Sequence, residues 1–198
     1  MPDPRTIAVY DIRAADYAHL TKAPPRPDLR AFIAAMPQAA RVLDLGCGPG
    51  AAAVHMQSAG LQIDAIDASA AMVAMARKAG IPARVATFDD VTQIEVYHGV
   101  WANFSLLHAA PADLPRHIGA IAKALVPGGL FHIGMKLGDG QARDAIDRLY
   151  TYVTTAALTD MLADVGLRPV STREGVDKGL AGTDDAFVVI QALKDKNA

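Results

Sequence analysis

Cysteine, long apolar runs and net positive charge are all scarce in this chain, and each scarcity excludes a class of protein. The single cysteine, Cys47, excludes an internal disulfide, so we expect a reducing, cytoplasmic compartment. A formal net charge of −2 leaves no excess of basic residues for binding nucleic acid. No apolar run reaches the roughly 18 residues of a membrane-spanning helix. The N-terminal stretch MPDPRTIAVYDIRAADY also lacks the apolar centre of a signal peptide.

Clustered metal ligands are missing as well. The six histidines lie in unrelated segments, and none stands near the cysteine at the spacing of zinc ligands. We therefore expect no metal site, no nucleic-acid partner and no membrane partner. The expected assembly is a monomer or a homodimer.

The segment VLDLGCGPG at residues 42–50 is the most informative motif that is present. Its first four residues are typical of a buried parallel strand, and the residues from 51 onward are typical of a helix. Gly46, Gly48 and Gly50 carry no side chain that would keep the backbone away from a ligand. A strand, a glycine loop and a helix form the opening of a dinucleotide-type α/β domain. The alternative is a strand-to-helix turn that binds nothing.

The spacing of these glycines separates the nucleotide-binding classes. No Gly-Lys-Ser or Gly-Lys-Thr follows, which excludes a P-loop, and a dehydrogenase would show G-x-G-x-x-G. With Asp44 two residues before the first glycine, the run DLGCGPG resembles the first motif of class I S-adenosylmethionine (SAM)-dependent methyltransferases. The resemblance implies that the loop passes under the amino-acid end and the ribose of SAM. The product of the cofactor would then be S-adenosylhomocysteine (SAH).

Asp67 ends the expected strand QIDAID at residues 62–67, about 20 residues past the loop, where a carboxylate can accept both ribose hydroxyl protons. The resemblance gives this position to the SAM ribose. The alternative is a helix cap, a role for which Ser69 competes ahead of residues 70–79. The cofactor residues that the resemblance implies are Asp44, Gly46, Cys47, Gly48, Gly50, Asp67, Ala68, Met72, Thr87, Phe88, Asn103 and Phe104. For Cys47, a nucleophilic thiolate is the alternative to a small packing residue.

The acceptor side of the site is less specific. His108 follows the strand expected over residues 99–107 and is the candidate general base, with a histidine bonded to the backbone as the alternative. Lys136 and Arg143 are candidates to clamp an anionic acceptor, or they belong to a solvated charged loop. The residues expected on the acceptor side are Tyr10, Tyr17, Lys136, Arg143 and Tyr150.

Three further stretches, YxxRAADY, WANFSLLH and IGMKLGDGQARD, resemble a group of small bacterial methyltransferases. Some of these are labelled as linked to tellurite resistance, and such a label does not carry a substrate to this chain. The predicted function is methyl transfer from SAM to a small-molecule acceptor. The alternatives are a non-catalytic SAM-binding protein and a nucleotide-dependent oxidoreductase.

The expected organisation is one domain with an N-terminal extension. Residues 1–27, which hold both tyrosines and the proline-rich bend APPRP, form a flap that either packs on the domain or acts as a lid over the SAM pocket. Residues 28–198 form a single SAM-dependent methyltransferase domain. The resemblance implies an α/β fold, a Rossmann-like three-layer sandwich with a seven-stranded, mostly parallel sheet whose strand 7 is antiparallel.

Overall fold

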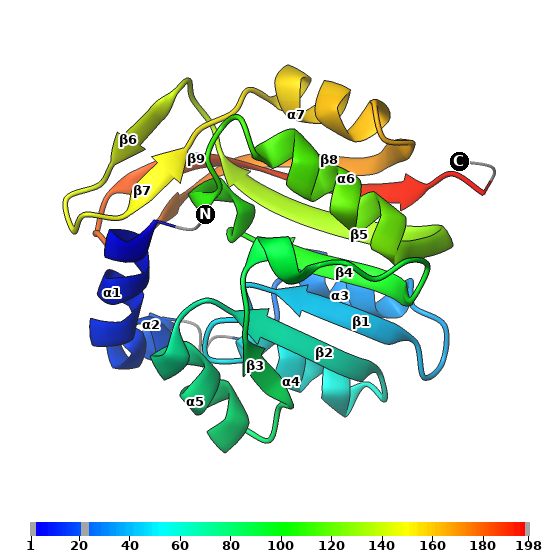
Figure 1. The fold of residues 1–198 in the computed structure, drawn as a ribbon, viewed down its shortest axis with the longest axis horizontal. Coiled ribbons are helices and arrows are strands. Elements are labelled where there is room, and N and C mark those ends of the chain that lie inside the picture. Colours follow the sequence, from blue (N-terminus) through cyan, green and yellow to red (C-terminus); the bar gives the residue numbers. More distant parts are fainter. Residues whose placement is uncertain (1–2, 21–23, 197–198) are drawn as a thin grey trace.

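The structure is a computed structural model that describes residues 3–20 and 24–196. A seven-stranded sheet forms its centre. Its strands are β1 (Arg41–Leu45), β2 (Gln62–Asp67), β3 (Ala83–Val85), β4 (Tyr97–Asn103), β5 (Leu125–Lys136), β8 (Leu167–Lys178) and β9 (Asp184–Lys194). Their order across the sheet is β3-β2-β1-β4-β5-β9-β8 (Figure 1). The first five strands in sequence pair in parallel, and β9 runs antiparallel to both β5 and β8. The predicted Rossmann-like sheet with an antiparallel last strand is confirmed.

The parallel strands end along one edge of the sheet. β1 ends at Leu45, β2 at Asp67, β4 at Asn103 and β5 at Lys136. The chain leaves β1 toward β2 on one side and returns to β4 on the other, so the strand order reverses between β1 and β4. A crevice at such a switch point, outside the carboxyl ends of the strands, is where open α/β sheets bind ligands.

Helices cover both faces of the sheet (Figure 1). They are α3 (Pro27–Ala34), α4 (Ala51–Ser58), α5 (Ala70–Lys78), α6 (Leu114–Ala124) and α7 (Thr155–Ala163), with 3-10 turns η1 (Phe88–Asp90) and η2 (Leu106–His108). Apolar side chains of α3, α4 and α5 pack with β1, β2 and β4 in two clusters, whereas those of α6 and α7 pack in a third cluster with β4, β5 and β9. The central strands are buried on both faces, which explains their continuous apolar runs.

Two small elements lie beside the carboxyl ends of the strands. The helices α1 (Pro4–Ile12) and α2 (Ala14–Leu20) stand next to this edge, at the left of Figure 1. Near them, β6 (Gln141–Arg143) pairs antiparallel with β7 (Leu149–Thr151). The glycine-rich segment at residues 138–144 is therefore not a plain loop, because part of it forms a hairpin. Ala23 of the expected bend lies outside the described residues. No helix within residues 3–20 and 24–196 is long and apolar enough to cross a membrane.

Candidate cofactor and acceptor site

The glycine loop after β1 turns over the end of β2. The backbone N–H groups of Gly46 and Cys47 both donate to the carbonyl oxygen of Ile66, at 2.8 and 2.9 Å. Gly46 has a φ of +76°, and a Cβ atom on it would lie 2.3 Å from the Cβ atom of Ser105. Only glycine fits this position without displacing the segment that follows β4.

Asp67 holds this loop in place with both carboxylate oxygens. Oδ2 accepts a hydrogen bond from the N–H of Gly48, and Oδ1 accepts one from the N–H of Ser69, each at 2.8 Å. Burial raises the pKa of the Asp67 carboxyl, while these backbone hydrogen bonds lower it. Each carboxylate oxygen has a second lone pair. Asp67 therefore combines a structural role with free acceptor capacity that faces a cavity.

Asp44 is a buried carboxyl group without a complete set of partners. Its side chain is 2% exposed, and its Oδ2 atom has no hydrogen-bond partner among the described residues. Burial raises the pKa of Asp44 to about 8, and the nearby charge of Asp67 adds to the rise. A buried polar atom that no protein group pairs is costly and calls for a specific explanation. A cationic ligand group in the adjoining cavity would supply the missing partner.

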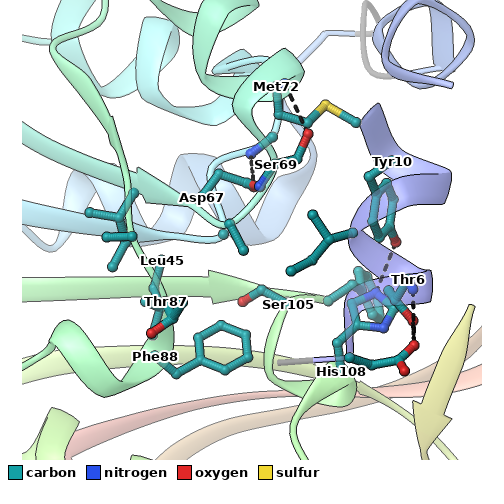
Figure 2. Close-up of a pocket in the computed structure, with 18 of the residues that line it drawn as sticks. Thr6, Tyr10, Leu45, Asp67, Ser69, Met72, Thr87, Phe88, Ser105 and His108 are labelled. Carbon is teal, nitrogen blue, oxygen red and sulfur yellow. Dashed lines mark hydrogen bonds between the residues drawn. The ribbon is translucent and has the colours of Figure 1, made fainter. Parts of the chain in front are cut away.

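A first cavity lies between the strand ends and α1 (Figure 2). Ala68, Met72, Thr87 and Phe88 line it together with Asp67, so side chains from after β2, from α5 and from after β3 meet there. Figure 2 shows that helix α1 closes the opposite side of this cavity with Thr6 and Tyr10. The cavity thus has a carboxylate at one end and an aromatic and apolar wall along its length.

A second cavity of about 350 Å³ adjoins the first, a volume within the range of small-molecule sites. The predicted residues that line it include Asp44, Cys47, Lys136 and Tyr150. Six residues line both cavities and form the boundary between them. They are Tyr10, Tyr17, Gly46, Gly48, Asn103 and Phe104.

His108 lies behind Tyr10 at the wall of the first cavity. Its Nδ1 atom lies 2.8 Å from the carbonyl oxygen of Leu149, and its Nε2 atom lies 2.9 Å from the hydroxyl of Tyr10. Burial lowers the pKa of His108 to about 4, and the nearby charges of Arg148 and Lys136 lower it further. The backbone contact considered as an alternative is present, and the ring also reaches a residue of the cavity wall.

Two of the predicted residues lie at neither cavity. The Arg143 guanidinium donates to both carboxylate oxygens of Asp3 at 2.9 Å, and neither cavity includes it. Arg143 therefore links β6 to the start of α1, and its expected contact with an acceptor stays a prediction. Gly50 has a φ of +85° and faces Ala76 of α5. Its role is close packing between α4 and α5, because a Cβ atom there would lie 3.1 Å from that of Ala76.

Arg148 is a buried cation at this site that the sequence did not indicate. It is 3% exposed, and its guanidinium donates to Oδ2 of Asp144 at 2.7 and 2.9 Å and to the hydroxyl of Tyr10 at 3.1 Å. Oδ1 of Asp144 accepts from the N–H groups of Ile146 and Arg148, so this carboxylate also fixes the turn between β6 and β7. The spacing of Asp144 and Arg148 gave no signal, because Arg143 and Asp147 are also four residues apart.

The orientation of Asn103 is set by a second histidine. Nε2 of His132 lies 3.1 Å from Oδ1 of Asn103, and the ring stacks on Trp101 with centroids 3.5 Å apart. Burial lowers the pKa of His132 to about 3, so the ring is neutral at ordinary pH. Nδ1 of His132 has no hydrogen-bond partner among the residues that the structure describes, and leaving a lone pair unpaired there costs less free energy than leaving an N–H unpaired. His132 therefore donates from Nε2, which leaves the Asn103 amide N–H₂ group free to donate elsewhere.

Cys47 does not have the environment of a nucleophile. Burial raises the pKa of its thiol, and the charges of Asp44 and Asp67 raise it further. A thiol that stays protonated is inert, so the structure favours a packing role. Within residues 3–20 and 24–196 no three side chains of His, Cys, Asp or Glu are placed to hold a metal ion.

Comparison with known proteins identifies the central part of the chain. The family model described as a methyltransferase domain matches residues 42–129, which run from β1 into β5. This segment, under half of the chain, has the sequence pattern of a methyltransferase domain. With the sheet described above it has the fold of the class I enzymes, so the resemblance seen in the sequence is confirmed, and the cofactor that goes with such a domain is SAM.

The solved structures with this fold include enzymes of different activities. The 1,6-didemethyltoxoflavin-N1-methyltransferase of Burkholderia thailandensis, solved with 1,6-didemethyltoxoflavin and SAH, has a TM-score of 0.75. It is 22% identical, and the alignment covers 96% of this chain and 88% of that chain. The cyclase SpnF has a TM-score of 0.72 at 18% identity, with 98% of this chain and 97% of that chain covered. These likenesses show the fold alone, and a cyclase among them means that the fold does not by itself establish methyl transfer.

A curated relative matches over a shorter length. The carboxy-S-adenosyl-L-methionine synthase of Stutzerimonas stutzeri is 32% identical over 113 residues, which are 49% of this chain and 45% of that enzyme. The chain spans about half the length of the curated relatives that it matches.

Proposed function

We propose that this protein binds SAM and transfers its methyl group to a small-molecule acceptor. The observation that carries the proposal is the pair of carboxyl groups beside the glycine loop. Asp44 has a buried oxygen that no described residue pairs, and Asp67 has free acceptor capacity at the cavity wall. SAM presents one group for each, an α-ammonium for Asp44 and a ribose diol for Asp67. A nicotinamide cofactor has no ammonium group, so Asp44 favours SAM over the oxidoreductase alternative.

The rest of the two cavities fits the same cofactor. The adenine ring would lie in the first cavity against Phe88 and Met72, beside Thr87 and Ala68. The methionine end would pass over Gly48 toward the second cavity, as the predicted cofactor residues require. The sulfonium would then lie at the boundary that both cavities share, close to the strand ends.

The second cavity is the proposed acceptor site. Lys136 and Arg148 give it positive charge, and Tyr150 lies between them, with Nζ of Lys136 at 3.8 Å from its ring centroid. Nζ of Lys136 also forms an ion pair with Asp185, at 2.7 Å from Oδ2, and an ammonium group has three hydrogens to donate. Bound SAM would add the positive charge of its sulfonium. We propose that the acceptor is anionic or carries an acidic group, and that Lys136 binds it.

For this reaction the chain mainly has to align the acceptor with the methyl group and to exclude water. The bound cofactor supplies an already activated methyl group. The chain would hold the acceptor in line with that group in the second cavity, which supplies the entropic part of catalysis. The N-terminal flap, residues 1–27, is the proposed lid, since Tyr10 and Tyr17 line both cavities. The lone buried thiol fits a reducing compartment, and the cytoplasm is the proposed location.

Binding and transfer are tested separately. Calorimetry with SAH and with NADH should show binding of SAH alone. Incubation of the protein with methyl-labelled SAM and a fractionated small-molecule extract should then yield a labelled product by mass spectrometry. If SAH does not bind, the proposal is wrong. If SAH binds but no labelled product forms from any fraction, the protein is a non-catalytic SAM-binding protein, the alternative considered from the sequence.

A further inference from the structure

Tyr10 stands between the second cavity and His108, and its hydroxyl is hydrogen-bonded to the imidazole. Its hydroxyl lies 2.9 Å from Nε2 of His108 and 3.1 Å from Nη1 of Arg148 (Figure 2 shows the histidine contact). Its side chain lines both cavities, whereas His108 lines the first one alone. A group in the second cavity therefore meets the Tyr10 hydroxyl before it meets the imidazole.

The donors and acceptors of this network have one consistent assignment. The carbonyl oxygen of Leu149 can only accept, so Nδ1 of His108 carries the hydrogen and donates to it. Nε2 of His108 then has a lone pair, and Tyr10 donates to it. Arg148 can only donate, so it occupies one lone pair of the Tyr10 oxygen. The hydroxyl of Tyr150, which also lines the second cavity, donates toward the second lone pair of that oxygen, so an acceptor bound there would replace Tyr150 as the donor.

We propose that Tyr10 is the catalytic residue that takes the proton of the acceptor, and that His108 takes the proton of Tyr10. This inference rests on the proposed methyl transfer. As the bond from the acceptor atom to the methyl carbon forms, the bond from that carbon to sulfur breaks and its electron pair stays on sulfur. The acceptor proton moves to the lone pair of the Tyr10 oxygen that Tyr150 otherwise faces, and the Tyr10 proton moves to Nε2 of His108. The products are the methylated acceptor, a neutral thioether, an unchanged Tyr10 and a protonated His108.

The charges around His108 explain why this proton moves only during the reaction. The imidazole is packed against Tyr150, with ring centroids 4.9 Å apart, and near the cations Arg148 and Lys136 and the carboxylate Asp144. Burial and the two cations lower the pKa of His108 to about 4, so the ring is neutral at ordinary pH and its Nε2 atom carries a lone pair. Methyl transfer removes the positive sulfonium from the same region. The new imidazolium replaces that charge, so the total charge of the site does not change.

The hydrogen-bond arrangement is tested by NMR on the SAH-bound protein with ¹⁵N-labelled histidine. We expect His108 as the Nδ1–H tautomer with an unprotonated Nε2, titrating far below the ordinary histidine range. Tyr10→Phe should raise the pKa of His108, because it removes a hydrogen bond to the neutral form. An Nε2–H tautomer in the wild-type protein, or a His108 titration that Tyr10→Phe leaves unchanged, overturns the proposal.

The proton transfer is tested with the acceptor that the labelled-SAM screen identifies. Tyr10→Phe and His108→Gln should each lower kcat by roughly 10²- to 10⁴-fold, with little change in the KM for SAM. The double variant should be no slower than the slower single variant, because the two residues act as a unit. Tyr152→Phe, a tyrosine at neither cavity, is the matched control and should keep full activity. A Tyr10→Phe variant with wild-type kcat, or additive losses in the double variant, overturns the proposal. If the wild-type protein methylates nothing, the proposed function fails and the proton step fails with it, whatever the NMR arrangement shows.

Discussion

Replacing Asp44 with asparagine should have opposite effects on stability and on cofactor binding. The pKa of Asp44 is about 8 in the folded protein, against 3.8 as its ordinary value. Between these values the unfolded chain binds fewer protons than the folded one, so the stability contribution of this group falls as the pH rises from 4 to 8. At pH 7 the difference is worth on the order of 4 kcal/mol. Asparagine carries no charge, so Asp44→Asn should raise the free energy of unfolding by about 2 to 4 kcal/mol at pH 7 and by little near pH 4.

Cofactor binding should respond in the other direction. SAH carries an α-ammonium group, which favours the ionised form of Asp44. At pH 7 about nine-tenths of these carboxyl groups are protonated when the pKa is 8. Binding of SAH should therefore release close to one proton, and its affinity should rise by up to about tenfold for each pH unit from 6 to 8 and then level off. Asp44→Asn should weaken the binding and abolish the pH dependence.

Calorimetry of SAH binding at pH 7 checks the affinity and the proton release of the wild-type protein and of Asp44→Asn. Titrations in phosphate and in Tris, which differ in ionisation enthalpy, give the number of protons released. Urea unfolding of the ligand-free proteins at pH 4 and pH 7 gives the stability difference. If the wild-type protein releases no proton, or Asp44→Asn releases as many as the wild type, the ammonium does not meet Asp44. If Asp44→Asn is less stable than the wild type at pH 7, the buried Asp44 carboxyl does not destabilise the folded protein as its raised pKa implies.

Three further substitutions test the surrounding geometry. Asp67→Asn keeps one acceptor oxygen and should weaken SAH binding by roughly 1.5 to 3 kcal/mol, and an unchanged dissociation constant in calorimetry would remove Asp67 from the ribose. Gly46→Ala forces a methyl group against Ser105 at a positive φ and should lower the free energy of unfolding by more than the roughly 1 kcal/mol expected for Gly60→Ala, where nothing lies within 4 Å. Equal losses in urea unfolding would contradict the close contact. Arg143→Ala should increase hydrogen exchange in α1 and leave the acceptor KM nearly unchanged, because its guanidinium is bound to α1 and lies at neither cavity. A raised KM with α1 unaffected would restore the contact with the acceptor expected from the sequence.

The sheet and the cofactor half of the site were predictable because their signals are local. The apolar run into the glycine loop and the acidic end of the next strand each occupy a few consecutive residues. Parallel strands then bring Leu45, Asp67 and Asn103 to one edge by topology alone. Ser69 likewise caps α5, as its position before residues 70–79 indicated.

The acceptor half was less predictable because its contacts join distant segments. Arg143 binds a carboxylate 140 residues away, and Arg148 reaches Tyr10 across 138 residues. Nothing in the sequence near Arg143 or Arg148 shows which of two similar cations is buried. The difference arises from the turn that Asp144 fixes, which directs Arg148 inward. The position of His108 directly after β4 predicted that it lies near the site. Its contact with Tyr10 could not be predicted, because it depends on how α1 packs against the carboxyl ends of the strands.

The hairpin of β8 and β9 has a consequence for how this protein could diversify. Its tip contributes residues 177–180 to the second cavity and nothing to the first. The turn closes on itself, with the N–H of Gly179 donating to the carbonyl oxygen of Thr183 at 3.1 Å. A change of length or sequence in this turn therefore alters one wall of the proposed acceptor site without touching the glycine loop. Variants with exchanged turns should keep their affinity for SAH while they differ in the acceptors they methylate, so the tip is a place where new selectivity can evolve or be selected in a library.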